Sequence, residues 1–156
     1  MTRLETLEPG LADRLQRASA TTQRRAALAA CDFAVGQSKI EHPLVKEVLE
    51  KLRAGNALES KERAELEALV LRLDEEYLDL QEAAENGRVT TNDYLRVFRQ
   101  ARAAASILSA FHDNPIQASH EAVYEAAAIT DEPAQLFARI DEVLLKVVEV
   151  TQKPLA

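Results

Sequence analysis

The spacing of apolar residues is the feature that most constrains the fold, because it follows steps of three and four along most of the chain. Leu66, Leu69, Val70 and Leu73 show this spacing in the middle of the sequence. Such steps place side chains on one face of an α-helix, whereas a half-buried strand alternates at every second residue. The 156 residues include only four glycines and five prolines, and strand-forming residues are sparse. The pattern therefore predicts an all-α protein.

Residues that start and stop helices divide this pattern into about seven helices with short connections. Proline suits a first helical turn, serine and threonine cap helix starts, and glycine ends helices. Ser60 is expected to cap one helix, and Thr90 with Asp93 has the spacing of a capping box. Helices are expected at about 10–18, 22–37, 43–54, 60–86, 90–111, 116–129 and 136–150. No linker is long enough to separate domains, so we predict a single all-helical domain over 1–156, a bundle of six to seven helices.

An offset of 75 residues aligns several positions, such as Arg24 with Arg99 and Val48 with Val123. This offset would make the second to fourth and the fifth to seventh helices two copies of a three-helix unit. Alanine-rich helices also match by chance, so a pseudo-repeat and a bundle without one both stay open.

The last helix has the widest apolar face, spanning roughly 160° at 100° per residue. A stripe of this width favours a helix packed between two others, and a homodimer interface is the alternative. Its apolar residues are Leu136, Phe137, Ile140, Val143, Leu144, Val147, Val148 and Val150.

Charge and cysteine content exclude several classes of partner. The formal net charge of −7 repels nucleic acid, and the basic group of Arg14, Arg17, Arg24 and Arg25 has no aromatic residue for base stacking. Cys31 is the single cysteine, so no intrachain disulfide forms, and its alanine-rich surroundings predict a buried thiol. The N-terminus lacks an apolar signal core, and no run reaches the roughly 20 apolar residues of a membrane span. We therefore expect a cytoplasmic protein with no nucleic-acid and no membrane partner.

Catalytic and metal-binding signatures are absent from the sequence. None of the three histidines follows a glutamate by three residues, as di-iron helical bundles require. No nucleophile elbow, phosphate loop or dinucleotide fingerprint occurs. We predict no catalytic residue, no metal site and no cofactor. One alternative is an enzyme or small-ligand binder with a site between helices, lined by Tyr94, His112, His120 and Tyr124.

The stretch DEEYLDLQEAAENGR, residues 74–88, carries six carboxylates on the longest expected helix. On a wheel with Leu66 at 0°, Glu75, Asp79 and Glu82 fall at about 160–220°, opposite the core face. Leu71 and Leu78 fall at about 120–140° and are expected to widen the apolar contact on one side.

Arginines of the next helix are the natural partners for these acids. In an antiparallel hairpin, Glu76 would face Arg102, with Asp79 opposite Arg99 and Glu82 opposite Arg96. Each step of three residues drifts by about 60°, so only the Glu76–Arg102 pair is expected to meet. The carboxylates of Glu75, Asp79 and Glu82 then face outward.

This outward face leads to the first functional hypothesis. Glu75, Asp79 and Glu82 would bind a basic protein, as in an inhibitor or a bacterial immunity-type protein that covers a basic cleft. The plainer interpretation is a solvated face that binds water only. A third hypothesis is a structural protein that self-associates through its last helix.

Overall fold

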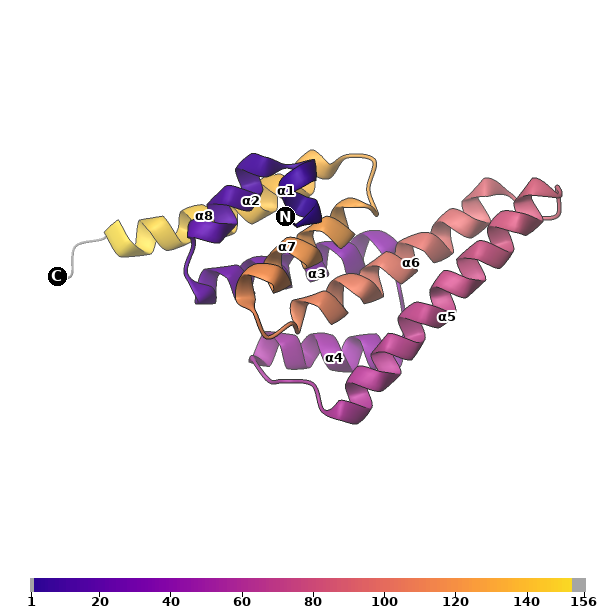
Figure 1. Cartoon of the computed structure of the whole chain (residues 1–156), viewed down its shortest axis with the longest axis horizontal. Helices are drawn as coiled ribbons and strands as arrows, with labels where there is room; N and C mark the ends of the chain where they lie inside the picture. The colour runs from indigo at the N-terminus through magenta and orange to yellow at the C-terminus, as the bar shows by residue number, and fades with distance from the viewer. Residues whose placement is uncertain (1, 153–156) are drawn as a thin grey trace.

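The computed structural model describes residues 2–152, with side chains up to Lys146, and these residues form eight α-helices (Figure 1). The helices are α1 (Arg3–Leu7), α2 (Pro9–Arg17), α3 (Ala20–Ser38), α4 (Pro43–Ala54), α5 (Ser60–Glu85), α6 (Thr91–Ala110), α7 (Pro115–Ala127) and α8 (Pro133–Gln152). The described part of the chain contains no strand. The predicted all-α bundle is confirmed, with one helix more than the sequence indicated.

The additional helix, α1, precedes α2, and Glu8 alone separates the two helices. The hydroxyl of Thr2 accepts a hydrogen bond from the backbone N–H of Glu5 at 3.3 Å, and the side chain of Leu4 is fully buried. A helix of five residues is too short to show an apolar period. Leu4 and Leu7 have helical spacing, but the Pro9-Gly10 pair led us to expect the regular helix only from about Gly10.

Most helix ends lie where the local residues indicated. Gly55 and Gly87 adopt left-handed φ values of 75° and 73° at the ends of α4 and α5, a conformation that glycine takes without steric cost. The backbone N–H of Thr90 donates to Asp93 Oδ2 at 2.9 Å, as a capping box requires. The expected Ser60 cap is wrong by one residue. Glu59 is the N-cap, and its N–H donates to the carboxylate of Glu62.

The centre of the bundle consists of α3, α6 and α7, whose facing residues are mostly alanine. Small side chains allow these helices to approach closely. In this core Ser106 donates to the carbonyl oxygen of Ala122 at 2.8 Å, and its Oγ lies 3.7 Å from Cys31 Sγ. Cys31 is fully buried, as expected, and burial raises the pKa of its thiol to about 12. The fully buried alanines of these three helices are Ala26, Ala27, Ala30, Ala34, Ala101, Ala103, Ala104, Ala110, Ala118, Ala122 and Ala126.

The two halves of the predicted pseudo-repeat pack differently. The offset of 75 residues pairs α3 with α6, α4 with α7 and α5 with α8. However, α7 packs extensively against both α3 and α6, whereas α4 makes only a few contacts with each of them. The order of helices recurs, and their packing does not.

Helix α8 packs mainly against α3 and also contacts α2 and α7. Leu136 and Ile140 are fully buried there, whereas the side chain of Leu145 is 60% exposed. The expectation of a helix held between others therefore fits the described part of α8. Val147, Val148 and Val150 of the predicted dimer face lie outside the residues whose side chains are described, and the homodimer stays a prediction.

Helices α5 and α6 form an antiparallel hairpin that projects from the bundle as an arm (Figure 1). Across the described residues, α5 contacts only α6 and, to a small extent, α4. An ion pair between Lys51 and Glu62 joins α4 to the first turn of α5. Most of the circumference of α5 is consequently uncovered. None of the described helices is sufficiently long and apolar to cross a membrane.

Candidate protein interface

The inner face of α5 carries the apolar seam that holds the arm together. Leu66, Leu69 and Leu73 are buried against the neighbouring helix, as the wheel predicted. Toward the tip, aromatic rings continue the seam. The ring of Tyr77 lies 5.2 Å from that of Phe98 and 6.0 Å from that of Tyr94, measured between centroids. This seam fixes which side of α5 turns outward.

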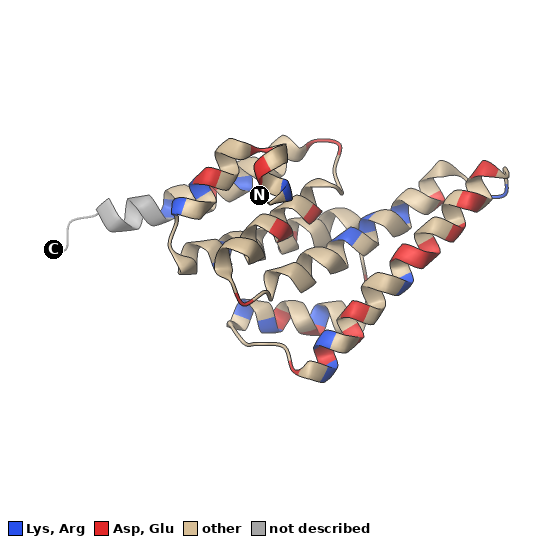
Figure 2. Ribbon diagram, viewed as in Figure 1, with Lys and Arg blue, Asp and Glu red and all other residues tan. Residues whose placement is uncertain are grey.

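The structure places the three predicted partner-binding residues on that outward side. Glu75, Asp79 and Glu82 are all exposed. Within the described part of the chain, none of the three has a hydrogen bond or an ion pair. Acidic segments follow one another along α5 toward the tip of the arm (Figure 2). Their carboxylates are therefore available to a partner.

Two leucines lie among these acids, and their position corrects the expectation from the wheel. The side chains of Leu71 and Leu78 are 61% and 58% exposed, respectively. The predicted apolar contact on that flank is wrong, because no helix in the described part of the chain covers that side of α5. A wheel gives the direction of a side chain but not whether a neighbour lies in that direction. The sequence feature that could have identified this pair is the spacing of seven residues between the leucines, which is about two helical turns and places them on the same side of α5.

We define the outer face of α5 by Leu71, Glu75, Leu78, Asp79 and Glu82. These five residues lie within an arc of about 100° on the helix circumference. Leu71 and Leu78 differ from the buried leucines of the seam, because nothing in the described part of the chain covers them. The face therefore combines exposed carboxylates with exposed apolar side chains.

The predicted ion pair between Glu76 and Arg102 is wrong. Arg102 instead binds both carboxylate oxygens of Asp74, at 2.7 and 2.9 Å. The partner therefore lies two residues closer to the start of α5, while Glu76 is exposed. The reason is a third helix, since the other arm of the Arg102 guanidinium reaches Glu125 of α7 at 2.9 Å. A register deduced from two helices alone does not include this contact.

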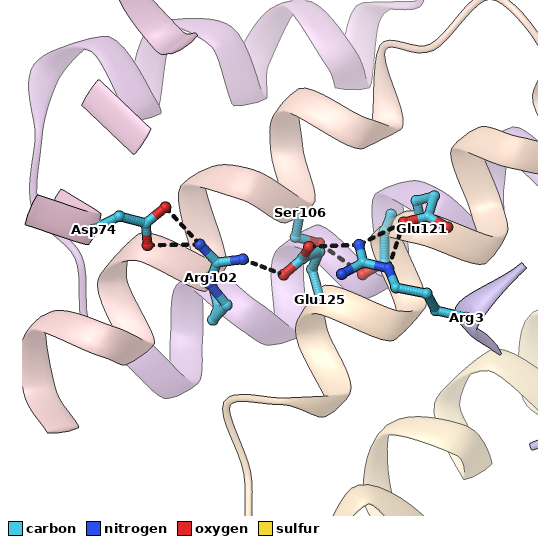
Figure 3. Close-up of polar contacts among 7 residues, drawn as sticks. Arg3, Asp74, Arg102, Ser106, Glu121 and Glu125 are labelled. Carbon is cyan, nitrogen blue, oxygen red and sulfur yellow. Dashed lines mark hydrogen bonds and ion pairs between the residues drawn. The ribbon is translucent and has the colours of Figure 1, made fainter. Parts of the chain in front are cut away.

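The contacts of Arg102 belong to a chain of charges that crosses four helices (Figure 3). Glu125 accepts from Arg102 on one side and from Arg3 of α1 on the other, at 2.8 Å. Arg3 also donates to Glu121 at 2.6 Å. Burial disfavours the charge on Arg102, but attraction to Glu125 and the hydrogen bond to Asp74 outweigh it and hold the pKa of Arg102 above its ordinary value. We call Asp74, Arg102 and Glu125 the Arg102 bridge, and it fastens the base of the arm to α7.

The four residues of the alternative site do not come together. His120 is fully buried, with Nε2 3.0 Å from the carbonyl oxygen of Ala12 and Nδ1 2.9 Å from the hydroxyl of Thr2. A carbonyl oxygen only accepts, so Nε2 carries the proton and the imidazole joins α7 to the first two helices.

The remaining members of that group lie in separate places. Tyr94 packs in the arm, and the Tyr124 ring lies 4.2 Å beneath the guanidinium of Arg3. His112 is exposed beyond the end of α6, where its Nδ1 accepts from the N–H of Asn114. It therefore lies outside the last helical turn of α6. Among the described residues, no group of three or more His, Cys, Asp or Glu side chains is arranged to hold a metal ion.

Comparison with known proteins adds no relative to this picture. No protein-family model matches the sequence, and neither the curated proteins nor the solved structures include a significant match. The functional argument therefore depends on the geometry of this chain alone.

Proposed function

We propose that the chain is a protein-binding module that covers a basic surface of its partner with the outer face of α5. An inhibitor or bacterial immunity-type protein acts in this way. The observation that carries the proposal is the exposed row of Glu75, Asp79 and Glu82 together with two exposed leucines on a side of α5 that no described residue covers. A reducing cytoplasm suits this chain, because its single cysteine, Cys31, is a buried free thiol.

The charge of α5 supports a basic partner. The helix contains nine acidic and three basic residues, a formal net charge of −6, and from Leu73 to Glu85 it contains six acids and no base. Asp74 is engaged by Arg102, and the other five carboxylates of this segment belong to exposed residues. A run of like charge produces a local potential that draws an oppositely charged surface into contact.

The leucines indicate what such a partner contains besides positive charge. Leu71 and Leu78 are seven residues apart, so they stand about 10.5 Å apart along the helix axis. Interfaces derive most of their affinity from a few side chains that fill pockets near the centre, with more polar groups around them. We therefore expect two shallow apolar pockets at this spacing on the partner, with lysine or arginine side chains between them.

Cross-linking in the native host tests the proposal. A carboxylate-to-amine cross-linker joins Asp or Glu of this chain to Lys of a bound protein. Cross-linked peptides should contain residues of the outer face of α5, and the variant Glu75→Lys, Asp79→Lys, Glu82→Lys should lose the partner. Its thermal stability should stay near that of the unmodified protein, because all three residues are exposed.

A matched control reverses three exposed acids on other parts of the chain, with the substitutions Glu41→Lys, Asp131→Lys and Glu142→Lys. This variant changes the net charge by the same amount and should keep the partner. Equal loss in both variants would mean that only total charge matters. Cross-links that map to another face would reject the α5 interface.

A further inference from the structure

A groove of about 490 Å³ lies between α3, the end of α4 and the turn that follows α6. In Figure 1 this is where the last turn of α4 faces the α6–α7 connection, well away from the tip of the arm. Apolar side chains of Leu28, Leu52 and Phe111 line it together with the side chains of three arginines, Arg24, Arg25 and Arg53. Its volume is in the range of sites that hold small molecules, roughly 300–1,000 Å³.

Two of these arginines are held in place by the protein. Arg24 donates to the carbonyl oxygens of Ala110 at 3.2 Å, His112 at 2.6 Å and Asp113 at 2.8 Å, so it caps the end of α6. Arg53 is paired with Asp32 and Glu50. These contacts hold Arg24 and Arg53 in place at the walls of the groove, and they occupy some of the N–H donors of both guanidinium groups.

Arg25 differs from them. It is exposed, it lines the groove, and within the described residues it has no hydrogen bond or ion pair. Two other arginines of the basic N-terminal group, Arg14 and Arg17, are paired with Asp141 and Asp13. Arg25 is thus a cation without a partner beside an apolar floor, in a chain whose net charge is −7.

We propose that this groove binds a small amphipathic carboxylate. Its carboxylate would pair with Arg25, because a guanidinium offers two parallel N–H donors that match the two carboxylate oxygens. Its hydrocarbon body would cover Leu28, Leu52 and Phe111 and remove their exposed surface from water. Asp113 also borders the groove and would disfavour a second negative charge, so a monocarboxylate is the expected class. The site shares no residue with the outer face of α5, and it is independent of the proposed protein partner.

Three probes of similar shape separate charge from apolar contact. Octanoate carries the carboxylate, octanol lacks the charge, and octylamine carries the opposite charge. Titration followed by backbone amide shifts should show saturable octanoate binding, with the largest changes at residues 24–28, 52–57 and 110–113. Octanol should bind more weakly by about tenfold or more, because its uncharged hydroxyl cannot form the two parallel hydrogen bonds of a carboxylate with Arg25, and octylamine should bind more weakly still.

The substitution Arg25→Glu tests the role of the guanidinium without disturbing the core, since Arg25 is exposed. It should weaken octanoate about tenfold or more and leave octanol nearly unchanged. Arg17→Glu, at an exposed arginine outside the groove, should leave both unchanged and controls for net charge. Equal affinity for octanoate and octanol, equal loss in both variants, shifts that map elsewhere, or no saturable octanoate binding would each overturn the proposal.

Discussion

Leucines on a single helix occupy opposite environments in this protein. On α5 the side chain of Leu73 is 8% exposed, whereas that of Leu71, two residues earlier, is 61% exposed. Both have the same helix propensity and the same side-chain volume, so they differ only in what covers them. This pair isolates the contribution of burial from every other effect of a leucine.

Substituting each leucine by alanine tests that difference. Leu73→Ala should lower the free energy of unfolding by about 2–5 kcal/mol, because it removes buried methyl groups and leaves a cavity. Leu71→Ala should change it by about 0.5 kcal/mol or less, as for other surface positions. Urea unfolding at constant pH measures both. A comparable loss in the two variants would show that Leu71 is covered in solution.

The sequence alone predicts the environment of some residues of α5 and not of others. The periodicity of α5 identified Leu66, Leu69 and Leu73 as core and placed Glu75, Asp79 and Glu82 opposite them. The exposure of Leu71 and Leu78 was not predictable, because it depends on the absence of a neighbouring helix. The contacts of Arg102 were missed because they depend on the presence of a third helix, since Glu125 lies 23 residues away on α7.

At the scale of elements, the caps and stops of helices were the most predictable features. Left-handed glycines and the Thr90–Asp93 box act within a few residues, so the local sequence contains the whole cause. Asp93 matters in particular because it begins α6 at the tip of the arm. The backbone N–H and the hydroxyl of Thr90 both donate to Asp93 and lower the pKa of its carboxyl below the ordinary value.

A depressed pKa in the folded state makes this cap sensitive to acid. In the unfolded chain the carboxyl of Asp93 has its ordinary pKa of about 3.9, so the unfolded state takes up the proton first as the pH falls. The stabilisation is complete above about pH 4–5 and is lost as the pH falls through the folded pKa. Asp93→Asn keeps an acceptor oxygen but does not titrate, so its stability should decline less steeply in acid.

Urea unfolding between neutral and strongly acidic pH measures this slope. Asp79→Asn is the matched control on the same arm, because the structure shows no hydrogen bond to Asp79 among the described residues. If the stability of Asp93→Asn declines in acid as steeply as that of the unmodified protein, the capping box does not contribute to the acid sensitivity.

At the scale of the whole molecule, the two proposed sites have opposite sign. The chain has a net charge of −7, helix α5 alone has a formal charge of −6, and the groove near Arg25 is a local exception. Reversing Glu75, Asp79 and Glu82 to lysine adds six charges and brings the net charge to −1. Electrostatic attraction to a basic partner should therefore be strong in the native protein and weak in this variant.

With the partner identified, the association rate constant should fall steeply as salt rises from low to high ionic strength. The dissociation rate constant should change much less, because short-range contacts of Leu71 and Leu78 are screened little. Stopped-flow mixing over a salt series measures both. An association rate that does not depend on salt would reject electrostatic steering and leave only the apolar contacts.

The projecting arm gives the molecule a region that can open without disturbing its centre. Beyond the Arg102 bridge, α5 contacts only α6 among the described helices, so separation of these two helices from the tip leaves α3 and α7 intact. Local opening requires less free energy than global unfolding, and amide hydrogens near Gly87 should exchange faster than those near Asp74. A protein bound on the outer face would slow this exchange, and its measured affinity would include the free energy of holding the arm closed.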